Sequence, residues 1–76
     1  MELKDFLENF AAQFDDTDPS EIQAGTVFKE LEEWSSLIAL SVIAMVDEEY
    51  DVQLKGADIR DSVTVKDLFE CISKNK

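Results

Sequence analysis

The sequence predicts an all-α fold, a small bundle of three to four helices with a long first loop, as a single domain over residues 1–76. Two stretches, 2–14 and 64–73, repeat apolar residues at the i, i+3, i+4 spacing that marks one face of an amphipathic helix. A third stretch, 36–50, is mostly apolar and contains neither glycine nor proline. Because a chain of 76 residues has room for one domain only, we expect these helices to share one core.

The first helix is expected over residues 2–14. Its apolar face comprises Leu3, Phe6, Leu7, Phe10, Ala11 and Phe14. Residues 15–35 follow as a long connection, and loops of this length are uncommon in compact domains and often functional. Within it, Asp18 and Pro19 predict a single turn, because an acidic cap followed by proline at the first helical position is a favoured start.

Residues 36–50 predict the second helix, with a core side and an outer side. The core side, spaced at about 100° per residue, comprises Ala39, Val42, Ile43, Val46 and Tyr50. The opposite side comprises Leu37, Leu40, Ser41, Ala44 and Glu48, with Ile38 and Met45 on the flank. Because one helix of a small domain is not buried on every side, we expect part of this apolar surface to be exposed or to meet a partner.

The last third of the chain predicts one extended segment and two helices. Residues 52–54 alternate like a strand but have no second strand to pair with, so an extended segment is expected. Residues 57–61 predict a short helical turn. Over 64–73, Thr64 is the expected cap and Asp67, three residues later, completes a capping box. The apolar stripe of this helix comprises Val65, Leu68, Phe69 and Ile72, and a basic end follows at 74–76.

The composition argues against several functions. Eighteen acidic and seven basic residues give a net charge of −11, which disfavours nucleic acid and anionic membrane surfaces as partners and favours basic proteins. No apolar run reaches the length of a membrane span and the start lacks a secretory signal, so a cytoplasmic monomer without membrane insertion is expected. Because the chain has no histidine and one cysteine, we expect neither an enzyme nor a metal centre.

Two adjacent serines, Ser35 and Ser36, stand at the start of the second helix and allow two interpretations. Serine is a favoured N-cap residue, so capping is the first. The second is a modification site, because a phosphodiester at a helix N-terminus is stabilised by free backbone N–H groups and by the helix dipole. The acidic residues between 30 and 51 are likewise either a solvated face or a docking surface for basic partners. Cys71 is expected to be a half-buried apolar residue, because no base is available to activate it.

Two segments carry a family resemblance. The first is Phe28-Lys29-Glu30-Leu31-Glu32-Glu33-Trp34-Ser35-Ser36-Leu37, and the second is Val46-Asp47-Glu48-Glu49-Tyr50-Asp51-Val52. Together they resemble the acyl carrier proteins, which show Phe-x-x-Leu, then Asp-Ser-Leu, then a helix that ends in acids, an aromatic residue and Asp. The stretch 63–72 is similar to the last helix of that family, so the resemblance extends over the whole chain.

The resemblance implies a carrier rather than a catalyst. The modified serine would be Ser36, esterified by 4′-phosphopantetheine, whose terminal thiol holds acyl groups as thioesters. A phosphopantetheinyl transferase would attach this arm, and acyl-transferring and condensing enzymes of fatty acid, polyketide or another specialised acyl pathway would use the cargo. The apolar interior would shelter an acyl chain, and the acidic second helix would dock on basic patches of these enzymes.

The chain departs from the family pattern near the serine. Ser35 replaces the usual acid, and Ile38 and Ser41 stand where the outer face of the second helix is often acidic. These departures favour a dedicated partner whose contact surface is apolar as well as basic. The expected docking residues are Leu37, Ile38, Leu40, Ser41, Met45, Asp47 and Glu48.

A non-catalytic acidic helical interaction module, with the same fold but without the arm, is the alternative function. It predicts that Ser36 stays unmodified and that Leu37→Ala or Leu40→Ala weakens the binding of a protein partner. An autonomous carboxylate hydrolase is disfavoured, because the chain has no histidine and is too short for a deep cleft.

Overall fold

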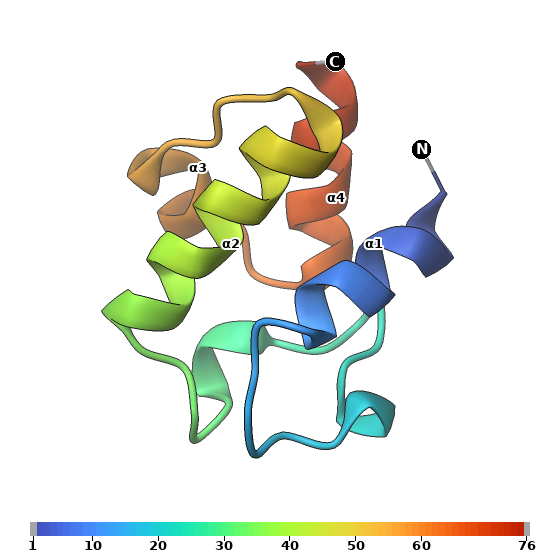
Figure 1. Cartoon of the computed structure of the whole chain (residues 1–76), viewed down its shortest axis with the longest axis vertical. Helices are drawn as coiled ribbons and strands as arrows, with labels where there is room; N and C mark the ends of the chain where they lie inside the picture. Colours follow the sequence, from blue (N-terminus) through green and yellow to red (C-terminus); the bar gives the residue numbers. More distant parts are fainter. Residues whose placement is uncertain (1, 76) are drawn as a thin grey trace.

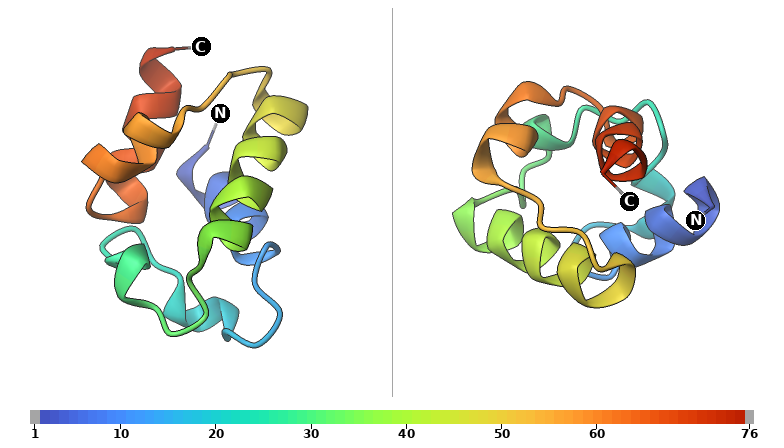
Figure 2. Two further views of the ribbon diagram at one scale, coloured as in Figure 1. Left: turned by 90° about the vertical axis from the view of Figure 1, so that its left-hand side faces the viewer. Right: turned by 90° about the horizontal axis from the view of Figure 1, so that it is seen from above.

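Within residues 2–75, four α-helices and two short 3₁₀ turns make up the fold. The computed structural model describes residues 2–75, and no residue in that range belongs to a strand. The elements are α1 (Leu3–Ala11), η1 (Pro19–Glu21), η2 (Phe28–Glu30), α2 (Ser36–Tyr50), α3 (Gly56–Asp61) and α4 (Val65–Lys74). Figures 1 and 2 show the helices arranged around a common core, with the long loop between α1 and α2 closing one end of it. The predicted all-α bundle with a long first loop is confirmed.

α1 is shorter than its apolar spacing predicted. It ends at Ala11, so the prediction of a helix to Phe14 was wrong at this end. The N–H groups of Gln13 and Phe14 donate to the carbonyls of Phe10 and Ala11, both with N···O distances of 3.1 Å. These i→i−3 bonds end the α-helix but continue the turn, so the Phe14 ring still reaches the core and is only 7% exposed.

α2 begins and ends where the sequence predicted, at Ser36 and Tyr50. It stops because Asp51 adopts a left-handed conformation, with φ 56° and ψ 39°, as the C-cap. The Tyr50 hydroxyl accepts a hydrogen bond of 2.8 Å from the Asn9 side chain. Asn9 is half-buried, and this bond links α1 to the end of α2.

The two C-terminal helices follow their predicted caps. Thr64 Oγ1 accepts from the Asp67 N–H at 3.2 Å, and the Asp67 carboxylate accepts from the Thr64 N–H at 3.0 Å, which confirms the capping box. α4 ends at Lys74, one residue later than expected, and α3 begins at Gly56, one residue earlier than expected. Residues 52–54 are extended and unpaired, as predicted, whereas Lys76 of the basic end lies outside the described residues.

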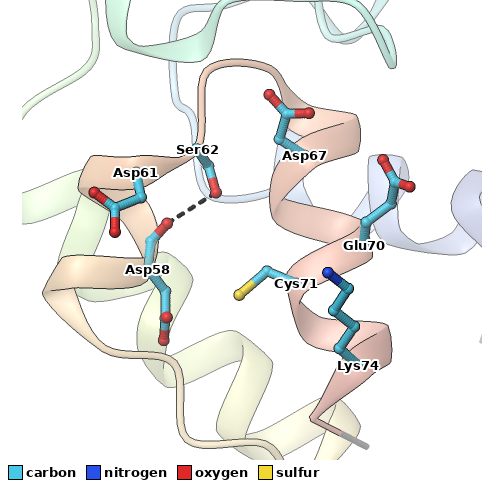
Figure 3. A pocket seen from close by; sticks show the side chains of 7 residues that line it. All are labelled: Asp58, Asp61, Ser62, Asp67, Glu70, Cys71 and Lys74. Carbon is cyan, nitrogen blue, oxygen red and sulfur yellow. Dashed lines mark hydrogen bonds between the residues drawn. The ribbon is translucent and has the colours of Figure 1, made fainter.

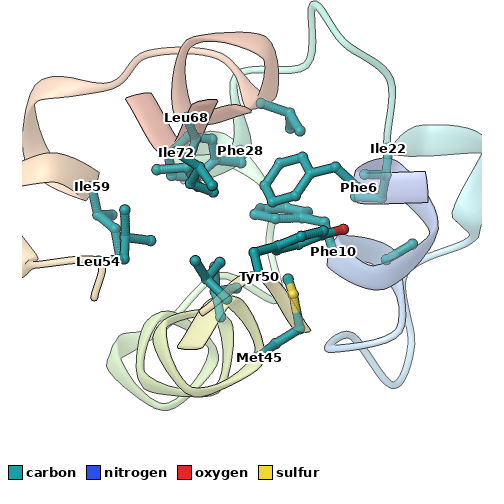
Figure 4. Close-up of a cluster of buried hydrophobic side chains, with 14 of the residues drawn as sticks. Phe6, Phe10, Ile22, Phe28, Met45, Tyr50, Leu54, Ile59, Leu68 and Ile72 are labelled. Atoms are coloured by element: carbon teal, nitrogen blue, oxygen red, sulfur yellow. The ribbon is translucent and has the colours of Figure 1, made fainter. Parts of the chain in front are cut away.

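The core consists mainly of aromatic and branched side chains, which come from all four helices, from the long loop and from residues 52–54 (Figure 4). Its fully buried members are Phe6, Phe10, Phe28, Val42, Val46, Val65, Leu68 and Ile72. Removing these side chains from water provides the main driving force for folding of a chain whose charges repel one another. Because the long loop contributes Phe28, the loop is part of the core and not an appendage to it.

Polar contacts fasten the long loop to the C-terminal half of the chain. Two backbone bonds run from Val65 N–H to the Thr26 carbonyl (3.1 Å) and from Lys66 N–H to the Ala24 carbonyl (2.9 Å). Both donors lie in the first turn of α4, where a helix has no carbonyl of its own to offer them. Lys29 Nζ donates to the Arg60 carbonyl at 2.6 Å, near the C-terminus of α3, where a cation is favoured. The loop therefore provides hydrogen-bond partners to the N-terminus of α4 and to the C-terminus of α3.

Glu33 holds the first part of the loop in place. Its carboxylate accepts hydrogen bonds from the N–H groups of Asp15 (2.6 Å) and Asp16 (2.9 Å) and from the Thr17 hydroxyl (2.8 Å). The Asp15 amide is the largest of the causes that hold the pKa of Glu33 below its ordinary value, because these donors stabilise the ionised form. Glu33, which lies three residues before α2, therefore acts as a clip: its hydrogen bonds hold residues 15–17 in place after the end of α1.

Candidate functional site

The two serines at the start of α2 have different roles. Ser35 is the N-cap, with extended backbone angles, and its Oγ accepts a hydrogen bond of 3.3 Å from the Ile38 N–H. Ser36 is the first residue of the helix and is exposed, and its hydroxyl forms no hydrogen bond with another residue of the 2–75 range. Capping and a free hydroxyl therefore occur together, each on its own serine.

The electrostatic setting of Ser36 suits a negatively charged group. The first bond at this helix end runs from the Ala39 N–H to the Ser35 carbonyl at 3.0 Å, so the N–H groups of Ser36 and Leu37 precede the helical ladder. The first turn of α2 contains no acidic residue. The partial positive charge of the helix N-terminus is therefore not neutralised by a side chain of its own first turn, and an anion bound to Ser36 is stabilised there.

The outer face of α2 continues from Ser36 as an apolar surface that ends in acids. Leu37 is 76% exposed and Leu40 is 61% exposed, and their spacing of three residues places them next to each other on this face. Ser41, Asp47 and Glu48 are exposed as well, and Ile38 is half-buried against the core. We call Leu37, Leu40, Ser41, Ala44, Asp47 and Glu48 the outer face of α2.

Met45 does not belong to this surface. It was expected on the flank of the helix among the docking residues, but it is only 7% exposed and points into the core (Figure 4). Met45 follows Val42 by three residues and so lies on the same side of α2 as that fully buried residue. The buried arc of α2 is therefore wider than the sequence spacing indicated, and the placement of Met45 was wrong.

Trp34 lies immediately before the two serines and covers one end of the core. Its ring centroid is 4.9 Å from that of Phe28, in an edge-on arrangement at 63°. It also stacks on Phe10 at 6.4 Å with an angle of 10° between the rings. The sequence left open whether Trp34 covers the core or faces a partner, and the structure places its ring, half-buried, on the aromatic cluster.

A second candidate region lies between α3 and α4, around Cys71 (Figure 3). This cavity of about 540 Å³ has a mainly acidic lining that includes Asp58, Asp61 and Glu70. Desolvation raises the pKa of the Cys71 thiol, and the nearby Asp58 carboxylate raises it further. A thiol in this setting stays protonated at neutral pH, so its half-buried position is that of a packing residue and not of a nucleophile.

Comparison with known proteins finds no matching family model, no matching curated protein and no matching solved structure. Within residues 2–75, no helix combines the length and the apolar character that crossing a membrane requires. The same range holds no group of three or more carboxylates and thiols placed to bind a metal ion. The site must therefore be judged on its own geometry, and the start of α2 offers the most specific features.

Proposed function

We propose that this chain is an acyl carrier protein of the cytoplasm that holds acyl intermediates as thioesters on a 4′-phosphopantetheine arm attached to Ser36. The observation that supports this proposal is the division of labour between the serines. Ser35 caps the helix, which leaves the Ser36 hydroxyl exposed at the N-terminus of α2. The resemblance of the chain to acyl carrier proteins names the same serine.

The chemistry of attachment needs only this hydroxyl from the carrier. Ser36 Oγ attacks the pantetheine-bearing phosphorus of coenzyme A, a phosphodiester forms, adenosine 3′,5′-bisphosphate leaves, and the serine proton passes to a base of the transferase. The product is an anion beside the free N–H groups of Ser36 and Leu37, where the helix N-terminus stabilises it. The carrier then contributes binding and presentation, and its partner enzymes contribute the acyl chemistry.

The outer face of α2 is the proposed docking surface for those enzymes. Leu37 and Leu40 provide apolar contact close to Ser36, and Asp47 and Glu48 provide negative charge further along the helix. A partner with an apolar patch beside a basic one matches this order. Partners of this kind are the transferase itself and acyl-transferring or condensing enzymes.

The intact mass of the protein tests the proposal. We expect incubation with coenzyme A and a broad-specificity phosphopantetheinyl transferase to add one arm to the native protein and to Ser35→Ala, and none to Ser36→Ala. Ser35→Ala is the matched control, since it changes the neighbouring hydroxyl only. Loading of Ser36→Ala, or no loading of a folded and unmodified native protein, would overturn the proposal.

A non-catalytic interaction module is the second candidate, and the exposure of Leu37 and Leu40 favours it. Both functions need these side chains, but only the carrier needs the Ser36 hydroxyl. Partner binding that is lost in Leu40→Ala and fully retained in Ser36→Ala, together with no mass gain, would establish the module.

A further inference from the structure

The interior of the bundle is filled by aromatic rings. Phe6, Phe10 and Phe28 have no exposed surface. The ring centroids of Phe6 and Phe10 are 5.8 Å apart, and those of Phe10 and Phe28 are 5.7 Å apart. Distances of this size are typical of rings in direct contact, so the middle of the core is occupied by a continuous aromatic cluster.

Trp34 extends this cluster to the end of the core that lies next to Ser36. It is only two residues from Ser36, and its ring contacts Phe28 and Phe10 at 4.9 and 6.4 Å. A chain that started at Ser36 and turned into the core at this end would have to displace an indole ring and then a fully buried phenyl ring.

Three cavities of the molecule lie away from α2. These cavities of about 540, 460 and 410 Å³ lie at the α3–α4 surface, beside the end of α1 and along the long loop, and no residue of α2 lines any of the three. All three have carboxylates in their linings, among them Asp58 in the first, Glu8 and Asp15 in the second and Glu30 in the third. Carboxylates are poor neighbours for an aliphatic chain, because burying them without a partner is unfavourable.

We infer that the cargo of this carrier is a short, polar acyl group that stays in solvent at the end of the arm. The inference rests on the carrier function proposed above. A long aliphatic chain would have to be removed from water to be carried stably, and a close-packed aromatic core accepts extra carbon atoms only with strain. A short acyl group that bears an amino, hydroxyl or carboxyl substituent needs no such shelter, and it leaves the aromatic cluster intact.

Chemical tethering at position 36 tests the state of the interior without any transferase. In a Ser36→Cys, Cys71→Ala protein, the introduced thiolate attacks an alkyl methanethiosulfonate, a disulfide forms and methanesulfinate leaves. We expect methyl, hexyl and dodecyl adducts to melt within about 1 °C of one another, with the same Trp34 emission maximum. A melting temperature that rises by several degrees from methyl to dodecyl, with a shift of Trp34 emission, would show that the chain enters the core and would overturn the inference.

Phe28→Leu in the same background provides the matched control, because it opens space in the middle of the cluster while keeping an apolar side chain. We expect the dodecyl adduct of this variant to melt several degrees above its methyl adduct, so that chain-length dependence appears only where space has been made. Trp34→Leu, at the half-buried end of the cluster, gives the same comparison should Phe28→Leu fold poorly.

The two proposals fail in different ways. No mass gain with coenzyme A and transferase overturns the carrier function, and the cargo assignment with it. Chain-length dependence in the tethered native core overturns the cargo assignment alone and leaves the carrier function in place.

Discussion

The first three turns of α2 carry apolar side chains on both faces, but the two faces have opposite surroundings. Val42 and Val46 have no exposed surface, whereas Leu37 and Leu40 on the outer face are 76% and 61% exposed. Both faces belong to the same helix, so the difference in exposure comes only from which side of α2 the rest of the chain covers. The two faces of α2 therefore have separate roles: the inner face stabilises the fold, and the outer face is available for contact with another molecule.

The largest expected effect comes from removing one side chain from each face. Met45→Ala should lower the free energy of unfolding by about 2–4 kcal/mol, because it leaves a cavity in the core. Leu40→Ala should change the free energy by less than about 0.5 kcal/mol, because the side chain is mostly in water and alanine favours the helix. Urea denaturation of the two variants measures both values.

The same two variants also test whether the outer face of α2 is exposed in the free protein. A loss of stability in Leu40→Ala as large as that in Met45→Ala would mean that the outer face is covered in the free protein. Repeating the titration at two protein concentrations would then identify a second copy of the chain as the cover, since the stability of a dimer depends on concentration.

A smaller effect separates the two serines at the start of α2. Ser35→Ala should lower the free energy of unfolding by about 1 kcal/mol, because the Ile38 N–H loses its acceptor. Ser36→Ala should leave it almost unchanged, because that hydroxyl holds nothing in place. Thermal melts of the two variants should rank them in this order. The reverse order would contradict the assignment of Ser35 as the cap and of Ser36 as the free hydroxyl.

Lowering the pH should weaken the hydrogen bonds made by carboxylates but not the apolar packing of the core. The pKa of Glu33 is lowered chiefly by the Asp15 amide, that of Asp67 chiefly by the Thr64 amide, and that of Asp18 chiefly by the Ser20 amide. A lowered folded pKa means that the native state binds fewer protons than the unfolded state, so stability falls as the pH drops below the ordinary values of 4.5 for Glu and 3.8 for Asp. Melting temperatures measured from pH 6 to pH 3 should show this decline, while the packing of Val42 and Val46 contributes no pH dependence.

Glu33→Gln is the control for the acid effect. The variant should be less stable than the native protein at pH 6, because an uncharged amide accepts the Asp15 and Asp16 hydrogen bonds less strongly. Its stability should also decline less between pH 4.5 and pH 3, since one of the three perturbed carboxyls is gone. An equal decline of stability in the two proteins would mean that Glu33 does not contribute to the loss of stability at low pH.

The parts of the fold that depend on neighbours in sequence could be predicted from the sequence. The capping box of Thr64 and Asp67, the turn at Asp18 and Pro19 and both ends of α2 involve residues a few positions apart, so their signals are local. The place of both serines at a helix start was a local signal of the same kind, but the choice of Ser36 between them came from the resemblance to acyl carrier proteins.

The parts that depend on distant segments could not be predicted. The burial of Met45 depends on how the rest of the chain covers α2, and no residue near Met45 carries that information. The clip formed by Glu33 joins residues 16 to 18 positions apart, and an acid in an acidic run gives no sign of such a role. The position of the Trp34 ring over the end of the core depends on Phe10, which belongs to α1.

The backbone bonds between the long loop and α4 have a consequence for synthesis of the protein. They join the carbonyls of Ala24 and Thr26 to the N–H groups of Lys66 and Val65, about forty residues further along the chain. On the ribosome, α1 and α2 emerge well before these donors exist outside the exit tunnel. The long loop that precedes Ser36 can therefore take its final form only after the start of α4 has emerged, and until then a nascent chain would display the Ser36 region without its native support.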